Sequence, residues 1–240
     1  WADGVNHARG HWLNGRLTSV DVATLIAAVC ARYGVAEIDV SACVARVEGF
    51  LIDRPMAGRD VLEGLLQTFG VDVAESGGVL RFRPRKVLQA ETVAAGDLID
   101  PGEDKPVFSE TRAQETDLPR LVRLTYIDAA SDYRSGSVSR ENAGTASLRE
   151  TTLQLPAVVS QSLAQARADV ALAEAWLDRS VAKFSLPPSA ARFEPGDVLM
   201  IDERRWRVTA ITDGEARAIT VSADDPAAHD PPPAASRVTA

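Results

Sequence analysis

Apolar residues between positions 19 and 33 recur every three or four residues, as they do on one face of an amphipathic helix. Ser19 or Asp21 can cap the first turn of this helix, because a short side-chain oxygen accepts from its free N–H groups. Gly34 suits the left-handed position that ends it. The residues expected to face the core are Val22, Leu25, Ile26, Val29 and Tyr33.

The same spacing predicts a second helix over residues 59–69, with Gly70 after its end. A short strand is expected between the two helices, within residues 44–52. Residues 71–84 alternate on both sides of a Ser-Gly-Gly turn, which is typical of a β-hairpin. Together these elements predict a compact helix–strand–helix–hairpin unit over residues 14–88. The core stripe of the second helix comprises Val61, Leu62, Leu65, Leu66 and Phe69.

The second half of the chain begins with two predicted strands and a long helix. Residues 120–128 predict a half-buried strand, residues 129–147 a long mobile loop, and a second strand ends at Pro156. The helix is expected from about residue 160 to residue 178. Its apolar stripe comprises Leu163, Ala166, Val170, Ala173 and Leu177, with Trp176 beside it.

Four stretches after the long helix alternate as strands do. They are residues 181–186, 197–201, 205–212 and 218–223. A turn with Pro195 and Gly196 at its centre leads into the second stretch, and Asp197 can bond back to the turn backbone. The residues of the third stretch expected to share one face are Trp206, Val208, Ala210 and Thr212.

These elements predict an α+β fold, in which the small helix–strand–helix–hairpin unit is followed by a β-barrel domain with a long crossover helix. The chain begins with Trp1 rather than Met and ends in Pro-rich sequence, so we expect an internal piece of a longer polypeptide. The expected parts are an entry segment from a preceding domain (1–13), the α/β unit (14–88), an acidic loop or linker (89–117), the β-barrel domain (118–225) and a Pro/Ala-rich linker (226–240).

The composition of the 240 residues, 45% hydrophobic and 25% charged, is ordinary for a globular protein. There is no run of 18 apolar residues and no basic-then-apolar leader, so neither a membrane span nor a signal peptide is predicted. Arginine outnumbers lysine 23 to 3, but the arginines are scattered. A GC-rich genome therefore explains them better than phosphate recognition does.

The net charge of −8 is concentrated in residues 89–117, where eight acids face Lys105 and Arg112, a balance of −6. An acidic chain is a poor binder of nucleic acid, because tight binding needs clustered cations to displace counterions. Four acids between Asp97 and Asp104 could gather around calcium, but their spacing does not fit an EF-hand loop, and a solvated linker is favoured. The eight acids are Glu91, Asp97, Asp100, Glu103, Asp104, Glu110, Glu115 and Asp117.

The three histidines, His7, His11 and His229, lie in the end segments, where we expect them to be away from every packed element. His7 and His11 are four residues apart, as in metal-binding helices, but Gly10 weakens a helix there. A solvated terminal arm is therefore favoured over a metal site.

Cys30 and Cys43 are too few for a disulfide scaffold or a zinc site. A bridge between them stays open, because geometry decides it and the sequence does not show it.

The chain shows no arrangement of residues that stands out as catalytic. Its serines lack the Gly-x-Ser-x-Gly elbow, the expected core holds no histidine to act as a base, and no glycine-rich phosphate loop follows a strand. Glu48, Asp53 and Glu63 could approach one another like the paired carboxylates of a glycosidase, but a surface or ion-pair role is favoured. We therefore predict no catalytic, cofactor-binding or metal-binding residue, and no cofactor.

Five stretches resemble, in order, a pattern found in phage tail-tip proteins. They are EGFLIDRP (48–55), AGRDVL (57–62), LRFRPR (80–85), LPRLVRLTYID (118–128) and the run from SLPP (185–188) to PGD (195–197). Each is unspecific alone, but their order and spacing over roughly residues 14–225 resemble the putative phage tail protein domain of siphophage-type hubs. The resemblance is strongest to the large tail-tip protein of alphaproteobacterial gene transfer agents.

That resemblance implies a structural hub at the distal end of a tail, in a virion or gene transfer agent particle assembled in the bacterial cytoplasm. Such hubs usually form trimers, in which two related β-barrel domains per subunit give a ring of pseudo-sixfold symmetry. The implied partners are sister copies, the distal tail protein, tail tube subunits, further domains of the same longer chain and the host envelope. DNA passes through the lumen without specific binding, and the family carries no catalytic residue in this region. Only one barrel fits these 240 residues, so the other is expected before Trp1 or completed by strands that flank the helical unit.

Two other classes of function stay open. A receptor- or carbohydrate-binding module is poorly supplied with aromatic platforms, since Trp206 and Trp176 are expected to be buried. An embedded cell-wall hydrolase of the peptidase kind lacks a core histidine.

For a tail hub, we hypothesise that the acidic segment, residues 89–117, faces the DNA channel and repels the polyanion. A position of this segment on the outer wall of the ring would contradict that hypothesis.

Overall fold

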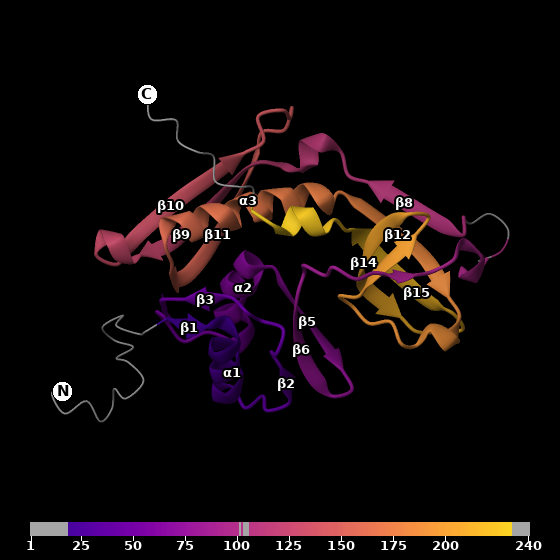
Figure 1. The fold of residues 1–240 in the computed structure, drawn as a ribbon, viewed down its shortest axis with the longest axis horizontal. Helices are drawn as coiled ribbons and strands as arrows, with labels where there is room; N and C mark the ends of the chain where they lie inside the picture. Colours follow the sequence, from indigo (N-terminus) through magenta and orange to yellow (C-terminus); the bar gives the residue numbers. More distant parts are fainter. Residues whose placement is uncertain (1–18, 101, 103–105, 232–240) are drawn as a thin grey trace.

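The computed structural model describes residues 19–100, 102 and 106–231. This part of the chain has the predicted mixed α+β character, with three α-helices and several sheets (Figure 1). The longest helix, α3 (Gln161–Leu177), lies in the middle of the molecule and connects a four-stranded sheet to a six-stranded sheet. No helix among the described residues has the length and apolar character needed to span a membrane.

The helices α1 (Val22–Arg32) and α2 (Gly58–Phe69) form where the apolar spacing predicts them. Gly70 ends α2 in the left-handed conformation, with φ of 60°. The sequence places Tyr33 in the core, but it is 42% exposed, because α1 ends before it and its hydroxyl donates to the carbonyl of Met56. The fully or almost fully buried residues of the two helices are Val22, Ile26, Val29, Cys30, Val61, Leu62, Leu65, Thr68 and Phe69.

The predicted hairpin consists of β5 (Val71–Ser76) and β6 (Val79–Pro84), with Gly77 and Gly78 at positive φ in the turn. β2 (Ile38–Asp39) adds to it in parallel beside β6.

The single strand predicted within residues 44–52 is in fact two short strands in different sheets. β3 (Arg46–Val47) pairs with β1 (Val20–Asp21), whereas β4 (Gly49–Phe50) pairs with the far strand β11. The chain changes partner at Glu48, whose N–H donates to the carbonyl of Val158.

The four-stranded sheet has the order β10–β9–β11–β4. β10 lies inside residues 129–147, so the prediction of a mobile loop there is wrong. Val138 is its only buried residue, and a polar strand with one apolar position carries too little alternation to be recognised. The three long strands are β9 (Pro119–Asp128), β10 (Arg134–Glu141) and β11 (Arg149–Val158).

The helix α3 begins at Ser160, whose hydroxyl accepts from the N–H of Leu163. Of the predicted stripe only Val170 is buried, so the predicted face is wrong. Small alanines let the helix approach the sheet closely, while its leucines lie half-buried along the flanks. The buried residues are Ala164, Ala168, Val170 and Glu174.

The six-stranded sheet has the order β7–β13–β14–β15–β12–β8. Its four central strands form where the sequence predicts them: β12 (Ser180–Leu186), β13 (Val198–Ile201), β14 (Arg204–Thr212) and β15 (Arg217–Ala223). Both edge strands come from the acidic segment, which is thus more than a loop or linker: β7 (Glu91–Thr92) and β8 (Phe108–Arg112).

This sheet curls strongly, but its edges do not pair. Two strands lie between β8 and β14, so a flat sheet would hold them about 14 Å apart. The rings of Phe108 in β8 and Trp206 in β14 nevertheless have centroids only 5.5 Å apart. The prediction of a closed barrel over residues 118–225 is therefore wrong for the described chain: α3 carries the chain from one sheet into another, and the second sheet is curled and open.

A β-bulge between Val208 and Ala210 divides β14. One extra residue reverses which side chains face the core. Trp206 and Val208 are each 1% exposed, whereas Ala210 and Thr212 are exposed to solvent. The predicted shared face therefore holds only as far as Val208.

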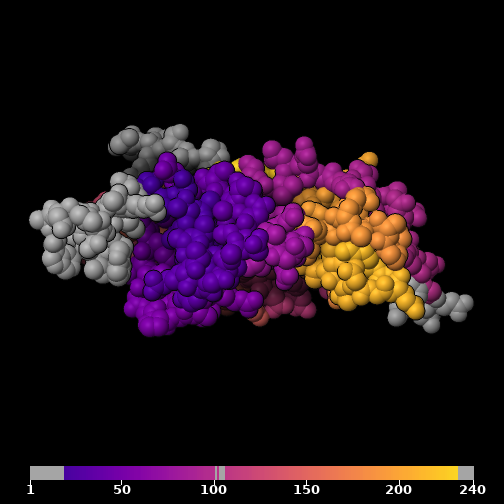
Figure 2. Space-filling view, turned by 90° about the horizontal axis from the view of Figure 1, so that it is seen from below, coloured from indigo at the N-terminus to yellow at the C-terminus, as the bar shows by residue number. Residues whose placement is uncertain are grey.

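The apolar core is divided in two. One part lies between the helical unit and the four-stranded sheet and includes Ile26, Leu65 and Leu124, all 0% exposed. The other fills the curled sheet around Trp206. Figure 2 shows the residues after α2, in purple to magenta, between the indigo helical unit and the orange to yellow sheet. The contact between the β5–β6 hairpin and the curled sheet is largely polar. Several charged side chains meet there.

Candidate functional site

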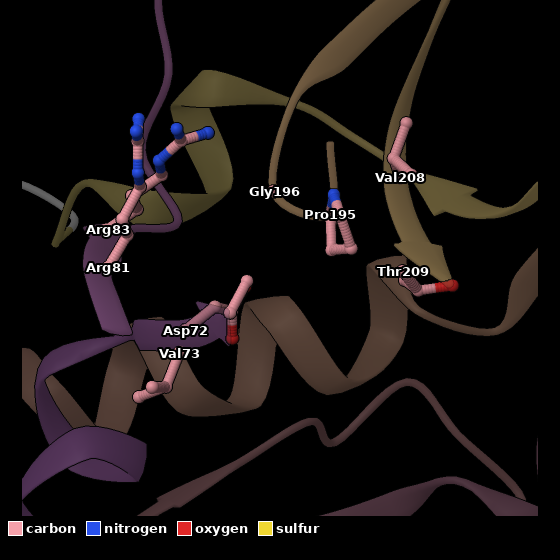
Figure 3. Close-up of a pocket in the computed structure, with 9 residues that line it drawn as sticks. Asp72, Val73, Arg81, Arg83, Pro195, Gly196, Val208 and Thr209 are labelled. Carbon is pink, nitrogen blue, oxygen red and sulfur yellow. The ribbon is translucent and has the colours of Figure 1, made fainter. Parts of the chain in front are cut away.

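A cleft of 210 Å³ separates the β5–β6 hairpin from the curled sheet. Figure 3 shows hairpin residues on one side of it and residues of the turn before β13 and of β14 on the other. The residues labelled there are Asp72, Val73, Arg81, Arg83, Pro195, Gly196, Val208 and Thr209.

The turn before β13 is the point on which the hairpin docks. Asp197 accepts from the N–H of Glu194 at 2.8 Å, which confirms that its side chain bonds back to the turn backbone. Arg83 of β6 then bridges both acids, with Nη2 to Glu194 at 2.9 Å and Nη1 to Asp197 at 3.2 Å. Ser76 at the hairpin turn also donates to Glu194. The turn itself does not require the contacts with Arg83 and Ser76, so these contacts serve the docking of the hairpin.

A second set of charges lies deeper, where the hairpin, α3 and the end of β15 meet. Arg85 donates to Asp72 through Nε and to Glu174 through Nη1, both at 2.8 Å. The Nδ1 atom of His229 lies 2.8 Å from Oε1 of Glu174. Glu174 thus joins an arginine from the hairpin to a histidine from the C-terminal end.

The other face of the His229 ring meets the curled sheet. Its Nε2 atom lies 3.4 Å from Oδ1 of Asp224 and 3.2 Å from Nη2 of Arg207. Asp224 also accepts from Arg205 at 2.9 Å, and Arg207 donates both to Asp224 and to the backbone carbonyl of Arg85. We call the set Asp72, Arg85, Glu174, Arg205, Arg207, Asp224 and His229 the ionic cluster.

Burial and ion pairing oppose each other in this cluster. Burial disfavours the charged imidazolium of His229, but hydrogen bonds to Asp224 and Glu174 outweigh it and raise the pKa to about 8. Burial alone would raise the pKa of Glu174, but its contacts with His229 and Arg85 outweigh burial and lower that pKa. The cluster is thus held in its charged form near neutral pH.

The cavity beside the cluster has a volume of 100 Å³, well below the several hundred Å³ typical of sites for small organic ligands. Glu174 and Asp224, the two best-buried acids, are each held by an arginine and by His229. His229 can gain or lose a proton within the ionic cluster. The cluster also links three parts of the fold, which are the β5–β6 hairpin, α3 and the curled sheet.

A larger groove of 710 Å³ lies between α1, α2 and the hairpin. Its lining is mainly apolar, with Leu62, Leu66 and Phe82 among the contributors. Among the described residues, Glu63 is the only carboxylate that lines this groove, so they do not supply there the pair of acids that glycosidase chemistry uses.

The residues proposed from the sequence as candidates fall mostly outside these sites. Glu48, Asp53 and Glu63 are all exposed, so no desolvated acid pair is formed among them. Trp206 is buried as predicted, but Trp176 is only half-buried, and its Nε1 donates to the carbonyl of Pro119 at 2.9 Å.

Cys30 and Cys43 are free thiols, both buried, which settles the open question of a bridge between them. The Cys43 thiol donates to the carbonyl of Phe82 at 3.6 Å. Burial raises the pKa of both thiols, so they behave as small apolar groups of the core.

The calcium hypothesis finds no support among the described residues, where no group of three or more metal-ligating side chains assembles. Asp97 accepts from the N–H of Ala94, and Asp100 from the N–H of Gly102. Glu103 and Asp104 lie outside the described residues, as do His7 and His11.

The acidic segment is partly neutralised by arginines from other elements. Three of its acids form ion pairs at its contacts with the rest of the fold. The pairs are Glu91 with Arg192, Glu110 with Arg204, and Asp117 with Arg149. These ion pairs add to the backbone pairing of β7 and β8, so the segment is not a bare acidic surface.

His229 lies in a different environment from the one that the sequence suggests. The sequence suggests a solvated end segment, but residues Pro226–His229 form a 3-10 helix and His229 is only 8% exposed. No periodic pattern in the sequence indicates this, because the partners Glu174 and Asp224 come next to His229 only in the folded chain. Glu174 sits 55 residues away along the chain.

Residues 57–211 match the family model described as Putative phage tail protein. A comparison with curated proteins finds no match. Among solved structures, a chain of the virion of a native gene transfer agent particle matches with 31% identity and a TM-score of 0.83. The match covers 96% of this chain and 53% of that one, so the chain spans about half the length of that relative.

Two prophage proteins share the fold at low identity. The 43 kDa tail protein of prophage MuSo2 from Shewanella oneidensis is 14% identical, with a TM-score of 0.55 over 92% of this chain and 70% of that one. A tail protein from Neisseria meningitidis MC58 is 12% identical, with a TM-score of 0.55 over 86% of this chain and 67% of that one.

Proposed function

This chain belongs to the Putative phage tail protein family, and from that premise we propose that it is a hub module at the distal end of a phage-like tail. In this proposal the module oligomerises into a ring, as a trimer of the longer polypeptide, at the end of the tail tube. DNA passes through the ring toward the host envelope without being bound specifically. The particle is assembled in the bacterial cytoplasm.

One observation carries the proposal. Almost the whole chain, 96% of it, superimposes on part of a protein chain from a gene transfer agent virion, with a TM-score of 0.83. The fold is therefore one that operates inside an assembled particle, and a structural role in a tail follows from the family.

The sheet edges support an assembly role. β10 ends the four-stranded sheet, and β7 and β8 end the six-stranded sheet, each with a hydrogen-bonded neighbour on one side only among the described residues. Free edges invite pairing with another chain, and closed symmetry hides them. We propose that sister copies, the distal tail protein, tube subunits or other domains of the longer chain cover these edges.

The passage of DNA is consistent with the charge of the chain. The net charge of −8 repels a polyanion, which keeps DNA from adhering to the module. Because three acids of residues 89–117 are ion-paired, we attribute the repulsion of DNA to the net charge of the whole chain.

The division of the chain into units at 14–88, 89–117 and 118–225 stays a prediction.

The proposal is tested in the bacterium that produces the particle. A short epitope inserted at Gly214, in the exposed turn between β14 and β15, is expected to be labelled at the tail tip of purified particles. An in-frame deletion is expected to leave particles that do not transfer DNA, and the epitope-bearing gene should restore transfer. Labelling of the capsid, or absence of the chain from purified particles, would contradict the proposal.

A further inference from the structure

β5 is the outer strand of the three-stranded sheet β2–β6–β5. At the base of the hairpin Arg85 donates its N–H to the carbonyl of Gly70, so the backbone groups of this pair face inward. Inward and outward backbone groups alternate along an antiparallel ladder. The N–H and C=O groups of Val71, Val73 and Glu75 therefore point away from β6, toward the open edge of the sheet.

The outward backbone groups of β5 are left without partners. No other part of the described chain accepts from the backbone N–H groups of Val73 and Glu75 or donates to their carbonyls. Val73 is 42% exposed and Glu75 is exposed as well, whereas Val71 is buried. Unpaired backbone groups on an edge strand can bind an extended segment, which then adds to the sheet as a further strand.

One face of this edge opens into the groove of 710 Å³ between the hairpin, α1 and α2. Val73 and Phe82 line the groove from the hairpin, and Leu62 and Leu66 line it from α2. Residues directly opposite each other on paired strands share a face. A segment paired with β5 would therefore place every second side chain, including the one opposite Val73, at this apolar groove.

The other face of the edge opens into the cleft of 210 Å³ toward the curled sheet (Figure 3). Asp72, Ala74, Arg81 and Arg83 line this cleft from the hairpin. Two of these charges are already neutralised, since Arg83 binds both acids of the turn before β13 and Asp72 binds Arg85. Arg81 has no acid paired with it among the described residues, and its Nε atom is buried without a hydrogen-bond partner.

Arg81 lies opposite Ala74 in the β5–β6 ladder. Because the alanine side chain is short, the arginine can reach across β5 to an acidic side chain on a strand added beyond it. The neighbour of Arg81 on its other side is Asp39 of β2, whose carboxylate accepts from the hydroxyl of Ser41. The cleft therefore favours acidic side chains at the positions that alternate with the apolar ones.

We propose that the edge of β5 binds an extended segment of a partner protein as an added antiparallel strand. In this strand, apolar side chains at the groove alternate with acidic side chains beside Arg81. Antiparallel pairing is the more stable of the two directions. The inference does not depend on the proposed tail function, and its failure would leave that function untouched.

The shape of the site and the composition of the chain decide which occupant fits. The turn at Pro195 faces β5 across the cleft (Figure 3), which leaves room for a single strand and not for a folded sheet. The end segments of this chain do not supply the acids, because residues 1–18 hold one, Asp3, and residues 232–240 hold none. The segment is therefore assigned to a partner protein.

The probe for this site is a seven-residue peptide, TVEVEVT, blocked at both ends. Its valines match the groove, and its glutamates match Arg81. Titration calorimetry with the full chain should give a dissociation constant below about 1 mM. With the peptide at about ten times that constant, hydrogen exchange at the amides of Val73 and Glu75 should slow about 10-fold. The amides of β9, which lies in another sheet, serve as the reference and should not change.

Methylation of the peptide backbone tests the pairing without any change in the protein. In an antiparallel strand the valine N–H groups of the peptide face β5, and the glutamate N–H groups face away. N-methylation of two valines should weaken binding at least about 10-fold, whereas N-methylation of both glutamates should change it less than about 3-fold. Any other pattern would overturn the antiparallel strand, and equal binding of both peptides would mean that the groove alone holds the ligand.

Substitutions at Val73 test the same hydrogen bonds from the side of the protein. Val73→Pro removes an outward N–H and no hydrogen bond to β6, so the hairpin should fold and bind TVEVEVT about 10-fold more weakly. Val73→Thr keeps the N–H and should bind within about 3-fold of the natural chain. Equal binding by Val73→Pro and Val73→Thr would contradict the proposed strand.

Charge reversal at Arg81 tests the choice of side chains. The natural chain should prefer TVEVEVT to TVKVKVT by about 5-fold or more, and Arg81→Glu should reverse that preference. Arg134→Gln, at an exposed position of β10, is the matched control and should change neither affinity. An unaltered preference in Arg81→Glu, or no binding of TVEVEVT at about 1 mM, would overturn the proposal. A dimer of the natural chain that Val73→Pro abolishes and the peptide dissociates would assign the edge to a second copy, and would overturn it as well.

Discussion

The backbone of Gly64 in α2 lies directly against the carbonyl oxygen of Gln154 in β11. A Cβ atom at Gly64 would come within 2.2 Å of that oxygen and 3.1 Å of the Pro156 ring. Only glycine permits this approach, which brings the helical unit onto the four-stranded sheet beside the pairing of β4 with β11. The two segments are 90 residues apart, so this contact joins the halves of the chain.

Gly64→Ala is therefore expected to destabilise the fold, although alanine normally favours a helix by about 1 kcal/mol. Since the clash is with backbone, we expect a net loss of about 1–3 kcal/mol in the free energy of unfolding. Urea denaturation measures it. Gly96→Ala is the control, because a Cβ there meets nothing within 4 Å. An equal or higher stability of Gly64→Ala would show that α2 can move away from β11.

The curl of the six-stranded sheet depends on Phe108 more than on ion pairs. Its ring stacks on Phe184 at 5.8 Å and meets the edge of Trp206 at 5.5 Å. Phe108→Ala should cost about 2–3 kcal/mol and increase hydrogen exchange in β8. Glu110→Ala removes the ion pair with Arg204, which is largely exposed, and should cost less than about 1 kcal/mol. Similar losses for both variants would contradict this ranking.

The turn between β13 and β14 holds two residues other than glycine at positive φ, Asp202 at 48° and Glu203 at 62°. Ile201 pairs with Arg204 on either side, so this is a two-residue hairpin turn, in which Asp-Gly is the preferred sequence. Glu203→Gly should raise the free energy of unfolding by about 1 kcal/mol. Glu215→Gly, in an exposed turn without positive φ, should not. A loss of stability in Glu203→Gly would mean that the glutamate side chain has an unrecognised contact.

The ionic cluster should also weaken in acid. The pKa values of Glu174 and Asp224 are lowered by His229 and the arginines despite burial, so the stability they contribute is present above about pH 4.5. It is lost as the pH falls through their lowered pKa values. Glu174→Gln should cost about 3 kcal/mol at pH 6, because it leaves Arg85 and His229 with one charged partner fewer. Its unfolding free energy should then fall less steeply with acid than that of the natural chain. An equally steep fall would exclude Glu174 as a source of the pH dependence.

Local patterns in the sequence predicted the local elements well. The spacing of apolar residues identified α1 and α2, and the Gly77-Gly78 turn identified the β5–β6 hairpin, because these signals depend on neighbours along the chain. The family resemblance was also confirmed.

Features that depend on distant partners were not predictable in this way. The bulge after Val208 reverses the faces of β14 without any mark in the sequence. β10 has a single buried residue, Val138, and becomes a strand because β9 offers it an edge. The strands on which the closed barrel was based are all present, but β7, β8 and β10 are missing from that set, and the sequence does not show which strands share a sheet.

The charged contacts were the hardest to foresee. Arg83 meets Glu194 at a separation of 111 residues, and His229 meets Glu174 at 55. In the sequence such residues look like solvated charges, since nothing local shows which of them lose their water. A buried aspartate or histidine is recognised only when the elements that carry its partners have been placed.

The most direct test of the central claim is an electron-microscopy map of the intact particle. We expect copies of this fold arranged symmetrically around the tail axis at its distal end, with the free edges of β8 and β10 against neighbouring chains and a lumen wide enough for DNA. A map in which the tail tip lacks this fold, or in which it lies away from the axis with both edges in solvent, would contradict it.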